Sequence, residues 1–145
     1  MRDLPRKLSV EELAGLFEGR TALVERLAAI EDPLGRADEV LAGLTDEEKV
    51  EALGAHPAIG ARGLSPRSAS EQGTDAEPAV LSELSYLNQV YEEKFGFRFV
   101  VFVAGRPKRE VLEVLRGRIA RAREEELDAG CRELVAIARD RWTRT

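Results

Sequence analysis

The chain contains one histidine, His56, which stands directly before Pro57 and just after the expected end of a helix near Gly54. Imidazole is the one side chain that titrates near neutral pH without perturbation, so a histidine in an irregular segment suits proton transfer. A structural role is the alternative, because the helix dipole favours a cationic side chain at a helix C-terminus. Spacing alone leaves both roles open.

A second group of polar side chains lies in residues 55–78, a stretch rich in glycine and proline that shows little periodicity. Irregular segments of about 20 residues inside a compact domain are usually functional or disordered. Ser68 and Glu71 have capping-box spacing and predict the start of a short helix, with Gln72 beside them. If that turn faces the histidine, its free N–H groups and polar side chains would bind an anionic ligand. Alternatively, Glu71 only closes the box and Gln72 is solvated.

An arginine near the end of the chain, Arg141, is the third candidate, because a guanidinium binds carboxylate oxygens in bidentate fashion. It stands among other arginines, Arg139 and Arg144, and its helical phase leaves its burial open. Solvation or pairing with the helix dipole is the structural alternative.

Length and composition are those of one globular domain spanning residues 1–145. Hydrophobic residues make up 43% and charged residues 34%, which excludes a disordered chain. The net charge of −5 disfavours general nucleic-acid binding, which needs clustered positive charge. No stretch approaches the roughly 20 apolar residues of a membrane span, and we expect no secretory signal because the N-terminal residues lack an apolar core.

The cysteine and histidine counts limit the redox and metal chemistry. One cysteine, Cys131, excludes an internal disulfide and fits a reducing cytoplasm. Zinc takes three or four nitrogen or sulfur ligands, so a chain with one histidine and one cysteine is not expected to hold a metal with protein ligands alone. Cys131 falls at an apolar position of a helical pattern and is interpreted as a packing residue.

The elements that must position these side chains are helices. Capping boxes begin at Ser9 and Thr45, and apolar residues follow both at helical spacing. Gly19 is expected to end the first helix, and Trp142 is expected to face inward from the last. The arginine-rich stretch 116–123 is interpreted as a solvated helix face. We expect helices over residues 10–18, 21–30, 34–44, 45–54, 77–94, 107–119 and 124–142.

Residues 97–103 form a single strand-like run, Phe-Arg-Phe-Val-Val-Phe-Val. A lone strand has no partner with which to pair, so we expect an extended segment wedged between helices. The predicted fold class is all-α, a single-domain bundle of about seven or eight helices with one extended segment.

Three motifs occur in a fixed order along the chain: H-P-A-I-G from His56, S-A-S-E-Q from Ser68, and L-N-Q-V-Y-E-E-K-F-G-F-R-F-V-V from Leu87. Together they resemble the 2-oxo-4-hydroxy-4-carboxy-5-ureidoimidazoline (OHCU) decarboxylase family of urate breakdown. The resemblance covers most of the chain. It implies an all-α fold, often dimeric, and a decarboxylation without cofactor or metal that gives (S)-allantoin.

The resemblance also implies roles for individual residues. The catalytic side chains would be those of His56, Glu71 and Arg141. The substrate-binding residues would be Pro57, Ser68, Gln72, Phe99, Val100 and Val101. The last three belong to the extended segment, which would line the active site through its backbone groups. The final helix ends in A-R-D-R-W, which departs from the R-L-R-L-like ending of the family, so Arg139 is the alternative to Arg141.

The expected partners and setting follow from the same resemblance. The substrate would be OHCU, the chain would form a homodimer, and a hydroxyisourate hydrolase would act just upstream as a functional partner. The chain ends in T-R-T and not in a peroxisomal S-K-L, so a cytoplasmic setting is expected. Two other functions stay open: a helical binding module without catalysis, and a decarboxylase of a related ureido or oxo-acid substrate.

Overall fold

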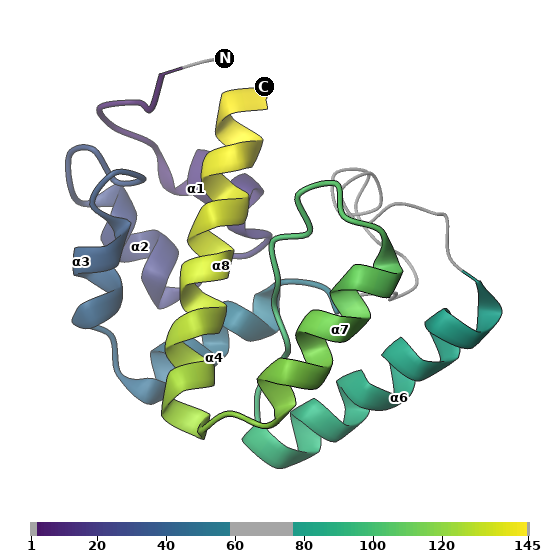
Figure 1. Cartoon of the computed structure of the whole chain (residues 1–145). Coiled ribbons are helices and arrows are strands. Elements are labelled where there is room, and N and C mark those ends of the chain that lie inside the picture. The colour runs from purple at the N-terminus through teal and green to yellow at the C-terminus, as the bar shows by residue number, and fades with distance from the viewer. Residues whose placement is uncertain (1–2, 59–76, 145) are drawn as a thin grey trace.

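The computed structural model describes residues 3–58 and 77–144. Seven helices and no strand lie in this part of the chain, which confirms the all-α fold class (Figure 1). The helices are α1 (Val10–Phe17), α2 (Ala22–Ala28), α3 (Ala37–Ala42), α4 (Asp46–Ala55), α6 (Pro78–Phe95), α7 (Lys108–Ile119) and α8 (Arg123–Arg144).

The two predicted capping boxes are present at the N-termini of α1 and α4. In the first, the Glu12 N–H donates to Ser9 Oγ at 3.1 Å and the Ser9 N–H donates to Glu12 Oε1 at 3.1 Å. Thr45 and Glu48 form the same reciprocal pair at α4. Each pair satisfies N–H groups that a helix start leaves without an intrahelical partner, which is why these two helix starts were predictable.

Helix α3 is shorter than the predicted 34–44, because a turn precedes it. Asp32 adopts a left-handed φ of 50°, and its carbonyl accepts from the Arg36 N–H at 2.9 Å. A Cβ on Gly35 would lie 2.4 Å from a carboxylate oxygen of Asp32, so a larger residue there would require the Asp32 side chain to move. The sequence did not indicate this turn, because apolar residues continue at helical spacing through it.

The long helix α8 runs through the middle of the bundle and contacts α1, α3 and α4 (Figure 1). Helices α6 and α7 pack against each other on one side. At the C-terminal end of α8, Trp142 packs against the hydrophobic core as predicted, but its side chain is only half-buried. The neighbouring Arg141 is fully buried. None of the described helices combines the length and apolar character that a membrane crossing needs.

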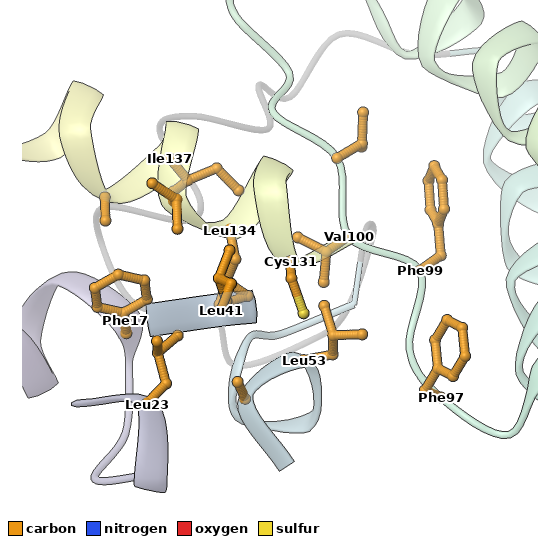
Figure 2. Packing of buried hydrophobic residues seen from close by; sticks show 14 of the residues in the cluster. Phe17, Leu23, Leu41, Leu53, Phe97, Phe99, Val100, Cys131, Leu134 and Ile137 are labelled. Atoms are coloured by element: carbon orange, nitrogen blue, oxygen red, sulfur yellow. The ribbon is translucent and has the colours of Figure 1, made fainter. Parts of the chain in front are cut away.

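The predicted extended segment connects α6 to α7 without pairing to another strand in the described residues. Its side chains alternate: Phe97 and Phe99 pack on Tyr91 of α6, with ring centroids 6.0 and 5.2 Å away. Figure 2 shows Val100 on the opposite side of the segment, facing Cys131 of α8. The segment is therefore buried on two faces, as its apolar sequence indicated.

Side chains take the place of a neighbouring strand. Arg118 Nη1 donates to the Val100 carbonyl at 2.7 Å, and the Phe102 N–H donates to Glu133 Oε1 at 3.3 Å. Arg118 also donates from Nε to Glu126 Oε1 at 2.7 Å. Arg118 and Glu126 are both buried. The prediction that the arginine-rich stretch is solvated is therefore wrong for Arg118. Buried backbone polar groups need partners, and here a buried guanidinium supplies one.

Candidate active site

The site begins where the C-termini of α1 and α4 meet. A Cβ on Gly19 would lie 2.9 Å from Ala55 Cβ, so glycine allows the two helix ends to touch. Gly19 was predicted to end α1, but the C-cap is Glu18, which adopts the left-handed conformation with φ 60° and ψ 34°. The close approach brings Glu18 of the first helix next to His56, the residue that follows Ala55.

His56 is the C-cap of α4, and its side chain is buried against α1. Its backbone is extended, and its N–H donates to the Leu53 carbonyl at 3.2 Å. Nδ1 of the imidazole lies 3.6 Å from Glu18 Oε2. The backbone of His56 therefore caps the helix, while its side chain has a carboxylate within ion-pairing distance. A capping role for the backbone of His56 is therefore compatible with a role for its side chain in proton transfer.

Arg141 reaches the same carboxylate from α8. Its side chain has an exposed fraction of 0%, and its Nη2 lies 3.7 Å from Glu18 Oε2. Its Nη1 donates to the Leu16 carbonyl at 2.9 Å, at the end of α1. The alternative arginine, Arg139, donates instead to the Leu34 carbonyl at 2.7 Å and is half-buried. The fold therefore brings Arg141, and not Arg139, to the carboxylate beside His56.

The extended segment is tied to the histidine through Arg98. Its Nη1 donates to the His56 carbonyl at 2.6 Å and to the Gly54 carbonyl at 3.2 Å. Its Nε lies 3.3 Å from Glu92 Oε1 of α6. These contacts fix the beginning of the extended segment against the end of α4. The segment that was expected to line the active site therefore starts beside the candidate catalytic histidine.

Comparison with known proteins identifies the family of the chain. A family model described as OHCU decarboxylase matches residues 2–143. The chain belongs to the OHCU decarboxylase family. This confirms the family that the three motifs indicated.

The family includes relatives of two kinds. The chain is 27% identical over 141 residues to the "Uric acid degradation bifunctional protein" of Bacillus sp. (strain TB-90), covering 87% of this chain and 27% of that protein. It is 30% identical over 99 residues to "2-oxo-4-hydroxy-4-carboxy-5-ureidoimidazoline decarboxylase" of Halalkalicoccus jeotgali (strain DSM 18796 / CECT 7217 / JCM 14584 / KCTC 4019 / B3), covering 65% and 56%. The chain spans less than a third of the length of the bifunctional relatives.

A solved structure of the same family has the same fold. The crystal structure of OHCU decarboxylase in the presence of (S)-allantoin superposes with a TM-score of 0.77, at 22% identity. The match covers 92% of this chain and 96% of the other. It confirms that the helical bundle and its extended segment form a fold of the OHCU decarboxylase family.

The remaining residues that the family resemblance implies are distributed as follows. Pro57 follows His56 and is half-buried, and the extended-segment residues 99–101 are buried. Ser68, Glu71 and Gln72 lie outside the described residues, so their approach to His56 stays a prediction. No cluster of three or more metal-ligating side chains occurs within residues 3–58 and 77–144.

Glu18 is the charged residue of this site that the sequence analysis missed. One local signal was available: a negative charge at a helix C-terminus is disfavoured by the helix dipole, and position 18 is such a terminus. A residue that breaks a local rule often has a partner elsewhere in the fold. Here the partners are an imidazole from α4 and a guanidinium from α8.

Cys131 borders a cavity of about 380 Å³ between α3, α4 and α8, whose lining includes none of Glu18, His56 and Arg141. The lining residues are Asp38, Leu41, Ala42, Lys49, Asp128, Cys131 and Arg132. Burial raises the pKa of the Cys131 thiol to about 12, so the thiol stays protonated at neutral pH. A protonated, buried thiol fits the packing role expected for it within the OHCU decarboxylase fold.

Proposed function

We propose that this chain catalyses the decarboxylation of OHCU to (S)-allantoin, without a cofactor, in urate degradation. The observation that carries the proposal is the meeting of His56 and Arg141 on one carboxylate. The family resemblance implied roles for both residues, with Arg139 as the alternative to Arg141, and the two residues lie far apart in the sequence. Membership of the family over residues 2–143 gives independent support.

The chemistry of the substrate suits these residue types. When the bond between the ring carbon and the carboxylate breaks, CO2 leaves and the electron pair moves into the neighbouring C=N–C=O system of the ring. A proton then adds to one face of the ring, which sets the configuration of the product. The enzyme must hold the carboxylate, stabilise the developing negative charge and deliver that proton.

Each proposed side chain has a part in these steps. Arg141 is buried and cationic, so it would bind an anionic oxygen of the substrate strongly. His56 would move the proton, acting together with Glu71. Contacts to the ureido and carbonyl groups would come from Ser68, Gln72, Pro57 and the peptide groups of Phe99, Val100 and Val101.

The cellular context is part of the proposal. We expect the chain to work in the cytoplasm as a homodimer, and light scattering coupled to size-exclusion chromatography measures its oligomeric state. Three relatives are named as uric acid degradation bifunctional proteins, which supports functional coupling to a second enzyme of the pathway. We expect that enzyme to be a hydroxyisourate hydrolase.

The decisive experiment follows the decay of freshly generated OHCU by circular dichroism. A decarboxylase accelerates the decay and produces a single enantiomer of allantoin. A binding module without catalysis leaves both the rate and the stereochemistry of the spontaneous reaction unchanged, and this result would overturn the proposal. A panel of related ureido and oxo acids distinguishes the third function, because a decarboxylase of another substrate would turn over a panel member faster than OHCU.

A further inference from the structure

We infer that Glu18 is the positioning residue of this site: its single carboxylate holds His56 and Arg141 in the arrangement that the reaction uses. The inference rests on the proposed function, in which both partners act on the substrate. Glu18 itself acts through them, so it is a positioning residue and not a catalytic one.

An imidazole and a guanidinium meet at one carboxylate oxygen. Glu18 Oε2 lies 3.6 Å from His56 Nδ1 and 3.7 Å from Arg141 Nη2. The exposed fractions of the three side chains are 15% for Glu18, 9% for His56 and 0% for Arg141. Water screens charges poorly in such surroundings, so the attraction is stronger than for ion pairs on the surface. The carboxylate also balances the charge of a guanidinium that is buried completely.

The backbone at Glu18 indicates that the side chain matters at this position. Its left-handed conformation is one that helix ends usually assign to glycine. A glutamate there is disfavoured both by that conformation and by the negative end of the helix dipole. Glycine in fact occurs at the next position, Gly19, where close contact with Ala55 requires it. The carboxylate of Glu18 therefore stands at a position where local preferences favour another residue.

The carboxylate bears on the tautomer of the imidazole. A carboxylate beside Nδ1 favours a proton on that nitrogen, which makes Nε2 the basic nitrogen of the neutral ring. Arg141 is held in a similar way: Nη1 donates to the Leu16 carbonyl, and Nη2 faces Glu18. Both contacts come from the C-terminal turn of α1. This turn thus sets the orientation of the imidazole and of the guanidinium together.

Nuclear magnetic resonance tests the inference directly, because the chain has one histidine. Untagged protein labelled with ¹⁵N-histidine gives a single pair of imidazole nitrogen signals, whose shifts report which nitrogen carries the proton. In the wild-type chain we expect the Nδ1-protonated form of the neutral ring. In Glu18→Ala the population should move toward the Nε2-protonated form. An unchanged population in this variant would overturn the inference.

A second variant covers the case in which Glu18→Ala does not fold. Glu18→Gln keeps an oxygen atom and the shape of the side chain but removes the charge beside Nδ1, so the Nδ1 proton signal should move upfield. Glu11→Gln is the matched control, because Glu11 is an exposed glutamate of the same helix. It should leave both the proton signal and the nitrogen shifts at their wild-type positions. Equal shifts in the two glutamine variants would contradict the pairing.

Steady-state kinetics then test whether the contact between Glu18 and His56 matters for the reaction. Loss of a carboxylate that orients an imidazole reduces activity about 10- to 100-fold in metal sites, and we expect a loss of kcat/KM in that range for Glu18→Gln with OHCU. Wild-type kcat/KM in Glu18→Gln would remove Glu18 from the reaction even if the spectra changed. Failure of the proposed function looks different, because the wild-type chain would then lack activity toward OHCU while the spectra still reported the pairing.

Discussion

The His56 carbonyl accepts a hydrogen bond of 2.6 Å from Nη1 of Arg98, a residue 42 positions further along the chain. This bond joins the end of α4 to the start of the extended segment. It places the backbone of the candidate catalytic histidine and the segment expected to contact the substrate in one rigid unit. The same guanidinium donates to the Gly54 carbonyl, so it satisfies two carbonyls at a helix C-terminus.

Replacing Arg98 should therefore loosen this junction. Arg98→Gln removes both bonds to the end of α4, and we expect a loss of about 1 kcal/mol in the free energy of unfolding, the typical value of a partly exposed hydrogen bond. Urea denaturation measures this change. Arg109→Gln, at an exposed position of α7, is the control and should stay within about 0.5 kcal/mol of wild type. A loss no larger than that of the control would show that the junction does not depend on Arg98.

Replacing His56 should impair catalysis more than folding. His56→Asn keeps a polar side chain at the C-cap, so the helical circular dichroism spectrum should be preserved. Well-placed proton donors contribute about 10²- to 10⁴-fold to rate, and we expect kcat for OHCU to fall by that factor. Circular dichroism of the allantoin formed measures the rate. Turnover near the wild-type value would exclude His56 from the mechanism.

Two arginines of α8 offer a matched pair of variants. Arg141→Lys keeps the positive charge beside Glu18 but loses the fork that donates to Leu16 and faces the carboxylate, so kcat/KM should fall by at least about tenfold. Arg139→Lys changes a side chain that donates to Leu34, and kcat/KM should stay close to wild type. Steady-state kinetics of both variants show which of the two arginines acts in the site. The opposite order of effects would make Arg139 the arginine of the site.

The helix starts and the extended segment were predictable because their signals are local. The capping boxes at Ser9 and Thr45 each need only four consecutive residues, and the run from Phe97 to Val103 is apolar except for Arg98. The short α3 was not predicted, because the turn at Asp32 depends on a left-handed backbone, which the spacing of the apolar residues does not indicate.

The buried charges could not be predicted, because their partners come from elsewhere in the fold. Arg118 belongs to a run of charges that looks solvated, yet it lies between Glu126 of the next helix and a carbonyl of the extended segment. Arg141 is buried because α1 supplies Leu16 and Glu18 to it. Local sequence around an arginine carries no information about such partners, and the family resemblance alone left Arg139 as an alternative to Arg141.

The buried network behind the extended segment gives a prediction on stability. The Tyr91 hydroxyl donates to Glu126 Oε1 at 2.6 Å, and both residues are buried. Tyr91→Phe removes a hydrogen bond to a charged group, which is worth about 1.5–3 kcal/mol in the free energy of unfolding. The exposed Tyr86 provides the control, and Tyr86→Phe should change that free energy by less than about 0.5 kcal/mol. Urea denaturation of both variants at neutral pH measures the difference.

The stability supplied by Tyr91 should also depend on pH. Burial, and then the hydrogen bond to Glu126, raise the pKa of Tyr91 above its ordinary value of 10.0. From about pH 10 upward the unfolded chain loses the phenolic proton while the folded chain keeps it, so the unfolded state binds fewer protons and the free energy of unfolding decreases as pH rises. Tyr91→Phe has no such proton. The stability gap between wild type and Tyr91→Phe should therefore narrow above pH 10. A gap that stays constant in that range would mean that the phenol ionises equally in both states, and a gap that widens would mean that folding favours the ionised phenol; either result contradicts the prediction.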